Sequence, residues 1–492
     1  MPSLIIKSPN QGIAQSPHVG FAEVVNLDIT TIPGITKLNT IMSKQSGTTV
    51  VGQINWFVRD PSNTNKIYAV DNAGQVYVGT YTTSWAWATV AGETAGGHGN
   101  GLMIWKDYLF VARDAYLDVY GPLSGSPSWS NSWKAIDSDV LWHPMLISKN
   151  DSKLYGGAGR FVFSLEENSG QTFAPGTPAS FTWTQQALDL PVSYRIKCIE
   201  ELGNNLILGT WQGTNIYDIR VADIFPWDRS SASFGQPIIL DEFGVHAMKN
   251  IGNILIVLAG IGGTIFRSDG VNAIPIGQMP QDLTGGKYLE WYPGAICSYK
   301  NKIFFGVGNG GTTAISGMGV YSLFQTGRGN VLNLEHQIST LSTGASNPLK
   351  VSALLPISRD TIQIGWRDNV IFGIDLSSST SFAFGTDYSG YFVTPLFTVG
   401  SNLNEYKFSQ IEFNLARPLR TTEGIKLEYR KDLTADFTTI GTFNYATWGA
   451  ILSKNIVAEI SNEIKSCEQI QFKISLNGSS TTSPELKSIS LK

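Results

Sequence analysis

The feature that most constrains the fold of this chain is a hairpin pattern that repeats along its first three quarters. Each copy consists of an apolar strand, a short turn with Gly, Asn or Asp, and a second apolar strand. The copies begin at Lys66, Tyr108, Lys153, Asn205, Ile254, Lys302 and Thr361, and successive starts differ by 42, 45, 52, 49, 48 and 59 residues. A period near 40–50 residues with several strands in each repeat is typical of β-propeller blades.

Each hairpin is interpreted as the middle of a four-stranded blade, because further apolar or Ser/Thr/Trp-rich strands flank most copies. A single blade cannot bury both of its faces, whereas blades stacked around an axis bury them and leave only short edges. Seven copies predict about seven blades. Six or eight remain open, because residues 1 to about 47 can supply a closing strand to the last blade. A long array of β-sandwiches would not keep this spacing, and a β-helix would have a much shorter period.

The hairpin repeat ends after about Gly390. Six or more short strands with alternating apolar and polar residues follow within about 100 residues, which indicates a jelly-roll-like sandwich. We therefore predict an all-β protein, a β-propeller of about seven four-stranded blades followed by a C-terminal β-sandwich. The expected boundaries are an N-terminal arm or closing strand at 1–48, the propeller at 49–390 and the sandwich at 391–492.

Composition agrees with many short strands and excludes some classes of function. Charged residues are only 15% of the chain, against about 25% in typical soluble domains, and Gly is abundant at 51 residues. The net charge of −4 offers no basic footprint for nucleic-acid recognition, although a neutral or acidic pore wall that lets DNA slide is compatible with it. No window has the length of a signal-peptide core or a membrane span, so we expect neither.

The cysteines and histidines are scattered. Three widely spaced cysteines, Cys198, Cys297 and Cys467, predict buried free thiols of a protein made in a reducing cytoplasm. The histidines show no metal-binding spacing; they are His18, His98, His143, His246 and His336. His98 lies in a Gly-rich loop that could approach a ligand, but such a segment is more often only a loop.

Other candidate motifs each have a structural explanation. The segment 168–173 is one degenerate Asp-box turn, as in sialidases, without the arginine triad that such enzymes need. The Gly-rich residues 306–311 join strands and open no helix. Trp227-Asp228 follows a proline and is not expected to end a strand as the WD dipeptide of WD40 blades does. Tryptophans in outer strands are expected to pack between blades.

Paired acidic residues complete the search for chemistry. Glu166-Glu167, Glu200-Glu201 and Asp241-Glu242 are adjacent, so on strands they would point to opposite faces and could not cooperate. We therefore predict no catalytic, cofactor-binding or metal-binding residues, no cofactor, and a protein that is not an enzyme.

Several segments resemble structural proteins of tailed bacteriophages. Residues 12–39 hold a Ser-Pro-His-Val-Gly motif before an Asn-Leu-Asp strand and a Pro-Gly turn, and residues 54–77 and 101–123 are similar in the same way. The C-terminal strands with their SPELKSISLK ending are similar to modules of tail and baseplate proteins. The nearest functional type is the propeller-containing tail hub or nozzle protein of short-tailed phages.

The resemblance implies a virion protein made in the host cytoplasm and assembled into a homo-oligomeric ring. Its implied partners are the adaptor and portal side of the tail, tail fibres, and passively the DNA that is ejected. It leaves open whether the chain is a hub, a nozzle or a collar. The alternative is a carbohydrate- or receptor-binding protein with a lectin-like sandwich, and a glycan-degrading propeller enzyme is a third hypothesis.

Overall fold

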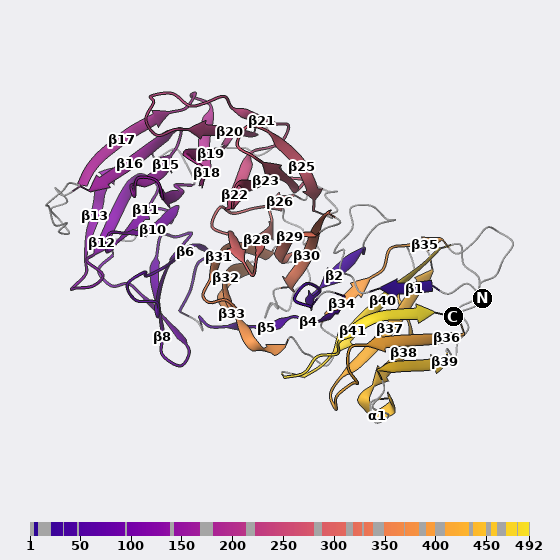
Figure 1. Cartoon of the computed structure of the whole chain (residues 1–492). Helices are drawn as coiled ribbons and strands as arrows, with labels where there is room; N and C mark the ends of the chain where they lie inside the picture. The colour runs from indigo at the N-terminus through magenta and orange to yellow at the C-terminus, as the bar shows by residue number, and fades with distance from the viewer. Residues whose placement is uncertain are drawn as a thin grey trace. The chain divides into compact units, whose positions relative to one another are not determined.

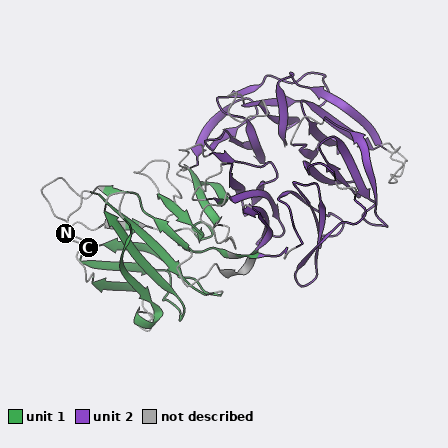
Figure 2. Ribbon diagram, turned by 180° about the vertical axis from the view of Figure 1, so that it is seen from behind, with its two compact units in different colours: residues 1–43, 319–339, 377–492 green, residues 44–318, 340–376 purple. Residues whose placement is uncertain are grey.

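The chain forms two compact units in the computed structural model. Unit 1 comprises residues 1–43, 319–339 and 377–492, and unit 2 comprises residues 44–318 and 340–376 (Figure 2). The residues described are 4–7, 21–32, 34–46, 49–93, 96–137, 142–167, 181–212, 222–279, 288–310, 318–326, 329–337, 349–368, 370–382, 390–398, 409–431, 436–448, 454–459, 469–479 and 481–491. This division by contacts does not test the expected domain boundaries after residues 48 and 390, which stay predictions.

Unit 2 is built from consecutive antiparallel sheets, five of which are complete four-stranded meanders. The first two are β6(Ile54–Arg59), β7(Lys66–Asp71), β8(Val76–Tyr81), β9(Trp85–Thr89), then β10(Gly101–Trp105), β11(Tyr108–Ala112), β12(Tyr116–Gly121), β13(Ser128–Ala135). The next two are β14(Met145–Ile147), β15(Leu154–Ala158), β16(Phe161–Glu167), β17(Phe181–Asp189), then β18(Tyr194–Leu202), β19(Asn205–Gln212), β20(Ala222–Trp227), β21(Ile238–Leu240). The fifth is β22(Val245–Ile251), β23(Ile254–Ala259), β24(Thr264–Ser268), β25(Ala273–Gln278).

Two further sheets complete the series. At the sixth position, β26(Leu289–Glu290) and β27(Ile296–Tyr299) both pair with β28(Lys302–Asn309). The seventh sheet has the order β31(Leu349–Pro356), β32(Ile362–Asp368), β33(Ile371–Phe382), β5(Thr40–Lys44), and the unit boundaries fall within its last two strands. Beside β33, Gln45 N donates to Ile374 O at 2.7 Å and Ile374 N donates to Ser46 Oγ at 3.1 Å. A segment from near the N-terminus is therefore the outer strand of the last sheet.

The sheets of unit 2 close into a ring (Figures 1 and 2). The innermost strands touch in sequence: β6 with β10, β10 with β14, β14 with β18, β18 with β22, β22 with β27, β27 with β31, and β31 with β6. Unit 2 is thus a β-propeller with seven blade positions, and the predicted fold class is confirmed. Below, the blades are numbered one to seven in this order.

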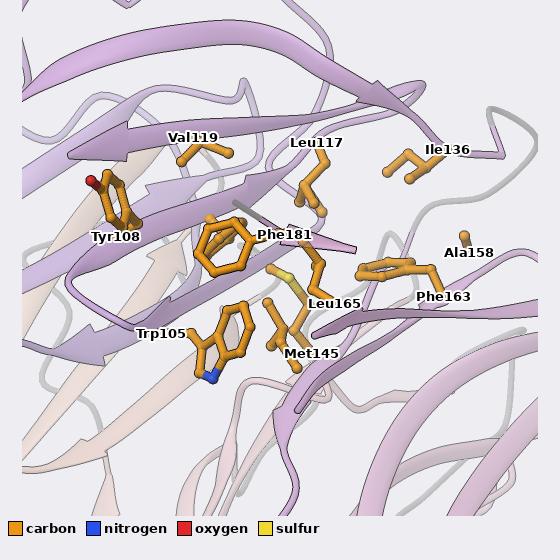
Figure 3. Close-up of a cluster of buried hydrophobic side chains, with 13 residues drawn as sticks. Trp105, Tyr108, Leu117, Val119, Ile136, Met145, Ala158, Phe163, Leu165 and Phe181 are labelled. Atoms are coloured by element: carbon orange, nitrogen blue, oxygen red, sulfur yellow. The ribbon is translucent and has the colours of Figure 1, made fainter. Parts of the chain in front are cut away.

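The core lies between blades, as the repeat predicts. Separate buried clusters join blades seven and one, one and two, two and three, three and four, and four and five. Figure 3 shows the cluster between blades two and three, where Trp105 and Phe181 lie 4.9 Å apart between ring centroids. In the same layer, the outer-strand Trp133 and Trp183 meet edge to face at 6.2 Å. These tryptophans of the outer strands therefore pack between blades, as expected.

Eight strands of unit 1 form two antiparallel four-stranded layers and pair in a nested order. The first strand pairs with the last, the second with the seventh, the third with the sixth and the fourth with the fifth. In chain order they are β1(Leu4–Lys7), β34(Gly390–Val393), β36(Gln410–Leu415), β37(Gly424–Lys431), β38(Thr438–Asn444), β39(Asn455–Glu459), β40(Gln469–Asn477) and β41(Leu486–Leu491). Phe413 of one sheet packs on Phe443 of the other, 4.7 Å between ring centroids. This is the topology of an eight-stranded jelly roll.

The jelly roll is discontinuous in sequence, because the blade strands all lie between its first strand, β1, and its second, β34. Short strands of unit 1 add to it: β2(Glu23–Val25) pairs with β34, and β35(Phe397–Thr398) pairs with β40. β29(Gly319–Thr326), β30(Gly329–Gln337) and the β3(Leu27–Asp28)–β4(Lys37–Leu38) ribbon complete unit 1, with the short helix α1(Tyr445–Trp448). Over the described ranges, no helix is both long and apolar enough to cross a membrane.

Candidate functional site

Buried polar side chains recur at one position of the innermost propeller strands. In blades one, four, five and seven the ladder between the first two strands shifts register by one residue. The residues inside these β-bulges are Asn55, Lys197, His246 and Ser352, and each is less than 9% exposed. A bulge re-aims the side chain of the extra residue, so polar groups that a regular strand would place elsewhere become available for other contacts.

Two of these side chains connect neighbouring blades by hydrogen bonds to the backbone. The Asn55 side-chain amide donates to Gly99 O at 3.0 Å, which joins blades one and two. The Ser352 hydroxyl donates to Ile54 O at 2.5 Å, which joins blades seven and one. The bulge residues therefore supply hydrogen bonds that hold the ring of blades together.

The third connection joins the other two bulge residues, one from blade four and one from blade five, and has unusual chemistry. Lys197 Nζ lies 2.7 Å from His246 Nδ1 and within 6 Å of the ring centroids of Trp142 and Trp211. Burial lowers the pKa of Lys197 to about 8, with Glu290 acting in the opposite direction. Burial and the nearby ammonium lower the pKa of His246 well below its usual value, so the imidazole is neutral and its Nδ1 accepts a hydrogen bond from the Lys197 ammonium. The aromatic rings stabilise the remaining positive charge.

Blade six continues this polar region. Tyr292 packs edge to face on Trp142, with ring centroids 5.6 Å apart. Burial and the neighbouring Glu290 carboxylate raise the pKa of Tyr292 well above its usual value, so the phenol stays protonated. Lys350 Nζ of blade seven lies 2.6 Å from Glu290 Oε2 and joins blades six and seven. The Lys197–His246 hydrogen bond and the Lys350–Glu290 ion pair thus connect blade four to blade five and blade six to blade seven.

A second buried ion-pair network joins blades one and two. Arg113 donates to Asp118 Oδ2 at 2.5 Å and to Gly74 O at 2.6 Å, and it also pairs with Glu93. The three charged side chains are each at most 4% exposed. Opposite charges buried this deeply depend on each other, because either partner alone would be an uncompensated charge.

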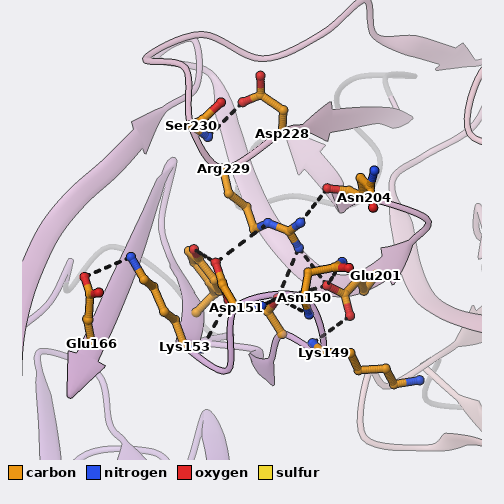
Figure 4. A network of polar contacts seen from close by, with 12 residues as sticks. Lys149, Asn150, Asp151, Lys153, Glu166, Glu201, Asn204, Asp228, Arg229 and Ser230 are labelled. Carbon is orange, nitrogen blue, oxygen red and sulfur yellow. Dashed lines mark hydrogen bonds and ion pairs between the residues drawn. The ribbon is translucent and has the colours of Figure 1, made fainter. Parts of the chain in front are cut away.

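A third network joins blades three and four (Figure 4). Arg229 donates to Glu201 Oε1 at 2.7 Å, to Ser148 Oγ at 3.1 Å and to Asn204 O at 2.7 Å. Burial acts to raise the pKa of Glu201, but hydrogen bonds from the Lys149 backbone and from neighbouring side chains hold the pKa below its usual value. The carboxylate is therefore ionised and firmly held at neutral pH.

Two of the three adjacent acidic pairs, Glu200-Glu201 and Glu166-Glu167, lie on strands, whereas Asp241-Glu242 follows the end of β21. Glu200 pairs with Lys249 of blade five at 2.7 Å, while its neighbour Glu201 binds Arg229. Likewise Glu167 pairs with Lys106 of blade two, whereas Glu166 pairs with Lys153 of its own blade, both at 2.9 Å. Adjacent acidic residues thus serve different partners, and two of these pairs also cross from blade to blade.

The histidines that the sequence singled out do not converge. His98 Nδ1 lies 3.0 Å from the Asp114 carboxylate with over half of its side chain exposed. His143 is fully buried, its Nδ1 3.0 Å from Gly157 O, and His336 is buried in unit 1. His18 lies outside the described residues. Within the part of the chain that is described, no group of three or more His, Cys, Asp or Glu is placed to hold a metal ion.

Other sequence predictions have mixed outcomes. Cys198 and Cys297 are buried free thiols, as predicted, and burial raises the pKa of Cys297 to about 12. Cys467 and the Asp-box segment 168–173 lie outside the described residues. Residues 306–309 belong to strand β28, so these glycines lie within a strand and do not join strands as expected.

The expectation for Trp227-Asp228 is wrong. Trp227 is the last residue of β20, the third strand of blade four, and Asp228 follows it directly. Pro226 is tolerated there because β20 pairs with the outer strand β21 only at residues 222–224, so the missing amide proton costs no ladder bond on that side.

Sequence reasoning missed Lys197 and His246. A signal exists in retrospect: each bulge residue is a single polar residue between an apolar residue and a mostly small or aromatic one. The four tripeptides are Ile-Asn-Trp at 54–56, Ile-Lys-Cys at 196–198, Val-His-Ala at 245–247 and Val-Ser-Ala at 351–353. Their common place before the hairpin repeat would have indicated equivalent positions in successive blades.

Comparison with known proteins adds little beyond the fold. No family model matches the sequence, and no curated protein is similar to it. Among solved structures, the chain is similar to the WD40 propeller domain of Doa1, with 11% identity, a TM-score of 0.43, and coverage of 70% of this chain and 97% of that one. It is also similar to the RRP9 WD40 repeats, with 10% identity, a TM-score of 0.46, and coverage of 69% and 99%.

Proposed function

We propose that this chain is a non-catalytic structural protein of a bacteriophage tail, a hub, nozzle or collar component. In this proposal it assembles into a homo-oligomeric ring that joins the head-proximal tail machinery to fibres or the distal tail, and DNA passes along it during ejection. Closed rings arise when a heterologous interface repeats around a cyclic axis.

The observation that carries the proposal is the use made of buried charge and polarity in unit 2. Arg113, Arg229, Lys197 and Asn55 each hold a neighbouring blade or the loop beside it. These charged and polar groups are occupied in fastening one blade to the next. A rigid body fastened in this way suits a load-bearing part of a particle.

Two further observations support the proposal. The sequence segments that resemble tailed-phage structural proteins include residues 54–77 and 101–123, which form much of blades one and two. In addition, large apolar side chains are exposed on the outer strands of two successive blades: Ile239 is 76% exposed and Ile274 is 56% exposed. Exposed apolar side chains on a sheet edge are suited to contacts in an assembly.

The proposal is tested by the mass of the purified chain in solution. Mass photometry and electron-microscopic class averages should show rings whose mass is an integer multiple of 53.5 kDa. The double variant Ile239→Asp/Ile274→Asp should shift the population to monomers, because it places charges on the exposed outer strands. Val192→Asp, at a residue 73% exposed in the connection before blade four, is the matched control and should leave rings intact. A monomer at every concentration of the unsubstituted chain would contradict the proposal.

A further inference from the structure

A pocket of about 640 Å³ lies on the rim of the propeller between loops of blades four and five. It is bounded by the start of β19, by the connection between β20 and β21, and by the turn between β24 and β25. Its volume falls within the range of small-molecule binding sites. Among the described residues, the hydrogen bonds and ion pairs given above between blades do not use the polar side chains that line it.

The lining is polar but almost uncharged. Its described residues include three side-chain amides, one carboxylate, serines and one aromatic ring, and no lysine, arginine or histidine. The amides belong to Asn205, Gln236 and Asn272, and none of them forms a side-chain hydrogen bond to another described residue. Each free amide offers both donors and acceptors to a ligand.

The neighbouring cation is turned away from the pocket. Arg229 has a left-handed backbone conformation, with φ of 69°, and its guanidinium is bound by Glu201, Ser148 and Asn204 O. Figure 4 shows Asp228 and Arg229 pointing in different directions from adjacent positions. The pocket therefore has an acidic group and no cation among its described residues, so it does not favour anionic ligands.

The loops around the pocket are held in shape by their own hydrogen bonds. Asp228 Oδ1 accepts from Ser230 N and from Ser231 N and Oγ, all at 2.9 Å, which lowers the pKa of Asp228 to about 2. Across the pocket, Asp269 Oδ1 accepts from Val271 N at 2.9 Å and Asn272 N at 2.7 Å. Such preorganised loops lose little conformational entropy when a ligand binds.

An apolar surface completes the site. The half-buried Phe234 packs edge to face on Phe225, with ring centroids 4.8 Å apart, and Gly235 N donates to Pro226 O at 2.7 Å. A positioned aromatic ring next to free amides and a carboxylate matches a molecule with an apolar C–H face and a rim of hydroxyl groups. A pyranose ring has this combination.

From this geometry we propose that the pocket between blades four and five binds a neutral saccharide. Phe234 offers apolar surface to the sugar ring, and Asn205, Gln236, Asn272 and Asp228 Oδ2 bind its hydroxyl groups. The site is a property of one chain and does not rest on the proposed tail function.

The test uses the full chain and an array of neutral oligosaccharides, including maltohexaose, cellohexaose, chitohexaose and lacto-N-tetraose, with sialyllactose as the anionic comparison. At least one neutral probe should bind, and calorimetry should show affinity weakened at least tenfold in Gln236→Ala/Asn272→Ala. Asn65→Ala removes an exposed amide in a turn of blade one and should bind normally. Thermal melting of each variant establishes that it is folded.

Three results would overturn the proposal: no neutral probe binds, sialyllactose binds better than every neutral probe, or the double variant binds as well as the unsubstituted chain. Because binding is measured on the isolated chain, each of these outcomes leaves the ring proposal standing. Conversely, a monomeric chain that binds a neutral oligosaccharide through this pocket would support the site and contradict the ring.

Discussion

At the scale of single residues, Arg113 pairs with two buried carboxylates at once. Its guanidinium bridges the Asp118 and Glu93 carboxylates and a backbone carbonyl of blade one, and all three charged side chains are almost fully buried. Lys106 and Glu167 also pair between blades, but both are more than 40% exposed. Solvent screening makes such an exposed pair worth little, whereas a broken buried pair leaves uncompensated charges.

We expect Arg113→Ala to reduce the free energy of unfolding by about 3–5 kcal/mol, because two buried carboxylates lose their partner. Lys106→Ala should reduce it by about 1 kcal/mol or less. Urea unfolding followed by tryptophan fluorescence measures both. Equal losses in the two variants would contradict the coupling described for Arg113.

Asp375 provides a pH-dependent test at the same scale. Burial raises its pKa from 3.8 to about 6, against the opposing effects of the Trp366 hydrogen bond at 2.7 Å and of Lys44. The folded state therefore binds a proton that the unfolded state has lost between these two pH values. The contribution of protonated Asp375 to the free energy of unfolding is fully present below pH 3.8. It declines as pH rises to about 6, by about 3 kcal/mol in total.

We expect Asp375→Asn to be more stable than the unsubstituted chain above pH 6, because the amide oxygen can still accept from Trp366 without a buried charge. The difference in melting temperature should shrink as pH falls from about 6 to 4. Thermal melting across this range measures it. An advantage of Asp375→Asn that is constant with pH would contradict the raised pKa.

At the scale of elements, the first strand of the jelly roll is the least expected. β1 pairs with β41 from Ile6↔Ile489 to Leu4↔Leu491, and Ile6 is only 3% exposed. This strand closes the nested pairing of the sandwich from the far end of the sequence. Without it, β41 would lose one of its two neighbours.

We expect Ile6→Ala to lower the free energy of unfolding of unit 1 by about 2–4 kcal/mol, through lost burial and a cavity. Val457→Ala, at a residue 43% exposed on β39, is the control and should change it by less than about 1 kcal/mol. Differential scanning calorimetry should show that Ile6→Ala lowers the melting temperature of unit 1, while the transition of unit 2 stays fixed. If both variants melt alike, β1 does not close the sandwich.

Local sequence patterns predicted most strands, because the two strands of a hairpin are neighbours in the sequence. The copy that begins at Lys66, for example, coincides with β7 and β8. The copy that begins at Lys302 instead extends from β28 of unit 2 into β29 of unit 1. The alternation of apolar residues alone cannot show to which unit a strand belongs. The pairing of β1 with β41 joins the two ends of the chain and has no local signal.

The polar contacts between blades were equally hard to predict. A lysine or histidine in a strand usually faces solvent, but a bulge shifts the register by one residue and turns Lys197 and His246 inward. Single-residue bulges depend on tertiary packing. The pocket lining could not be predicted either, because Asn205, Gln236 and Asn272 come from the start of β19, the β20–β21 connection and the β24–β25 turn.

At the scale of the whole molecule, a propeller lies in sequence within a jelly roll. Both units are all-β, and in unit 2 hydrogen bonds and ion pairs connect neighbouring blades at most of the interfaces in the ring. Such an architecture is suited to a body that keeps its shape while other proteins attach to it. The proposed place for this body is a ring in a phage tail.

The most direct test of that claim is a cryo-electron microscopic reconstruction of tailed particles produced from the genome that encodes this chain. The account predicts density for a ring in the tail, each subunit of which fits the seven-bladed propeller and the jelly roll as separate bodies. Purified particles in which this chain is absent, or in which it occurs only as a single copy outside the tail, would contradict it.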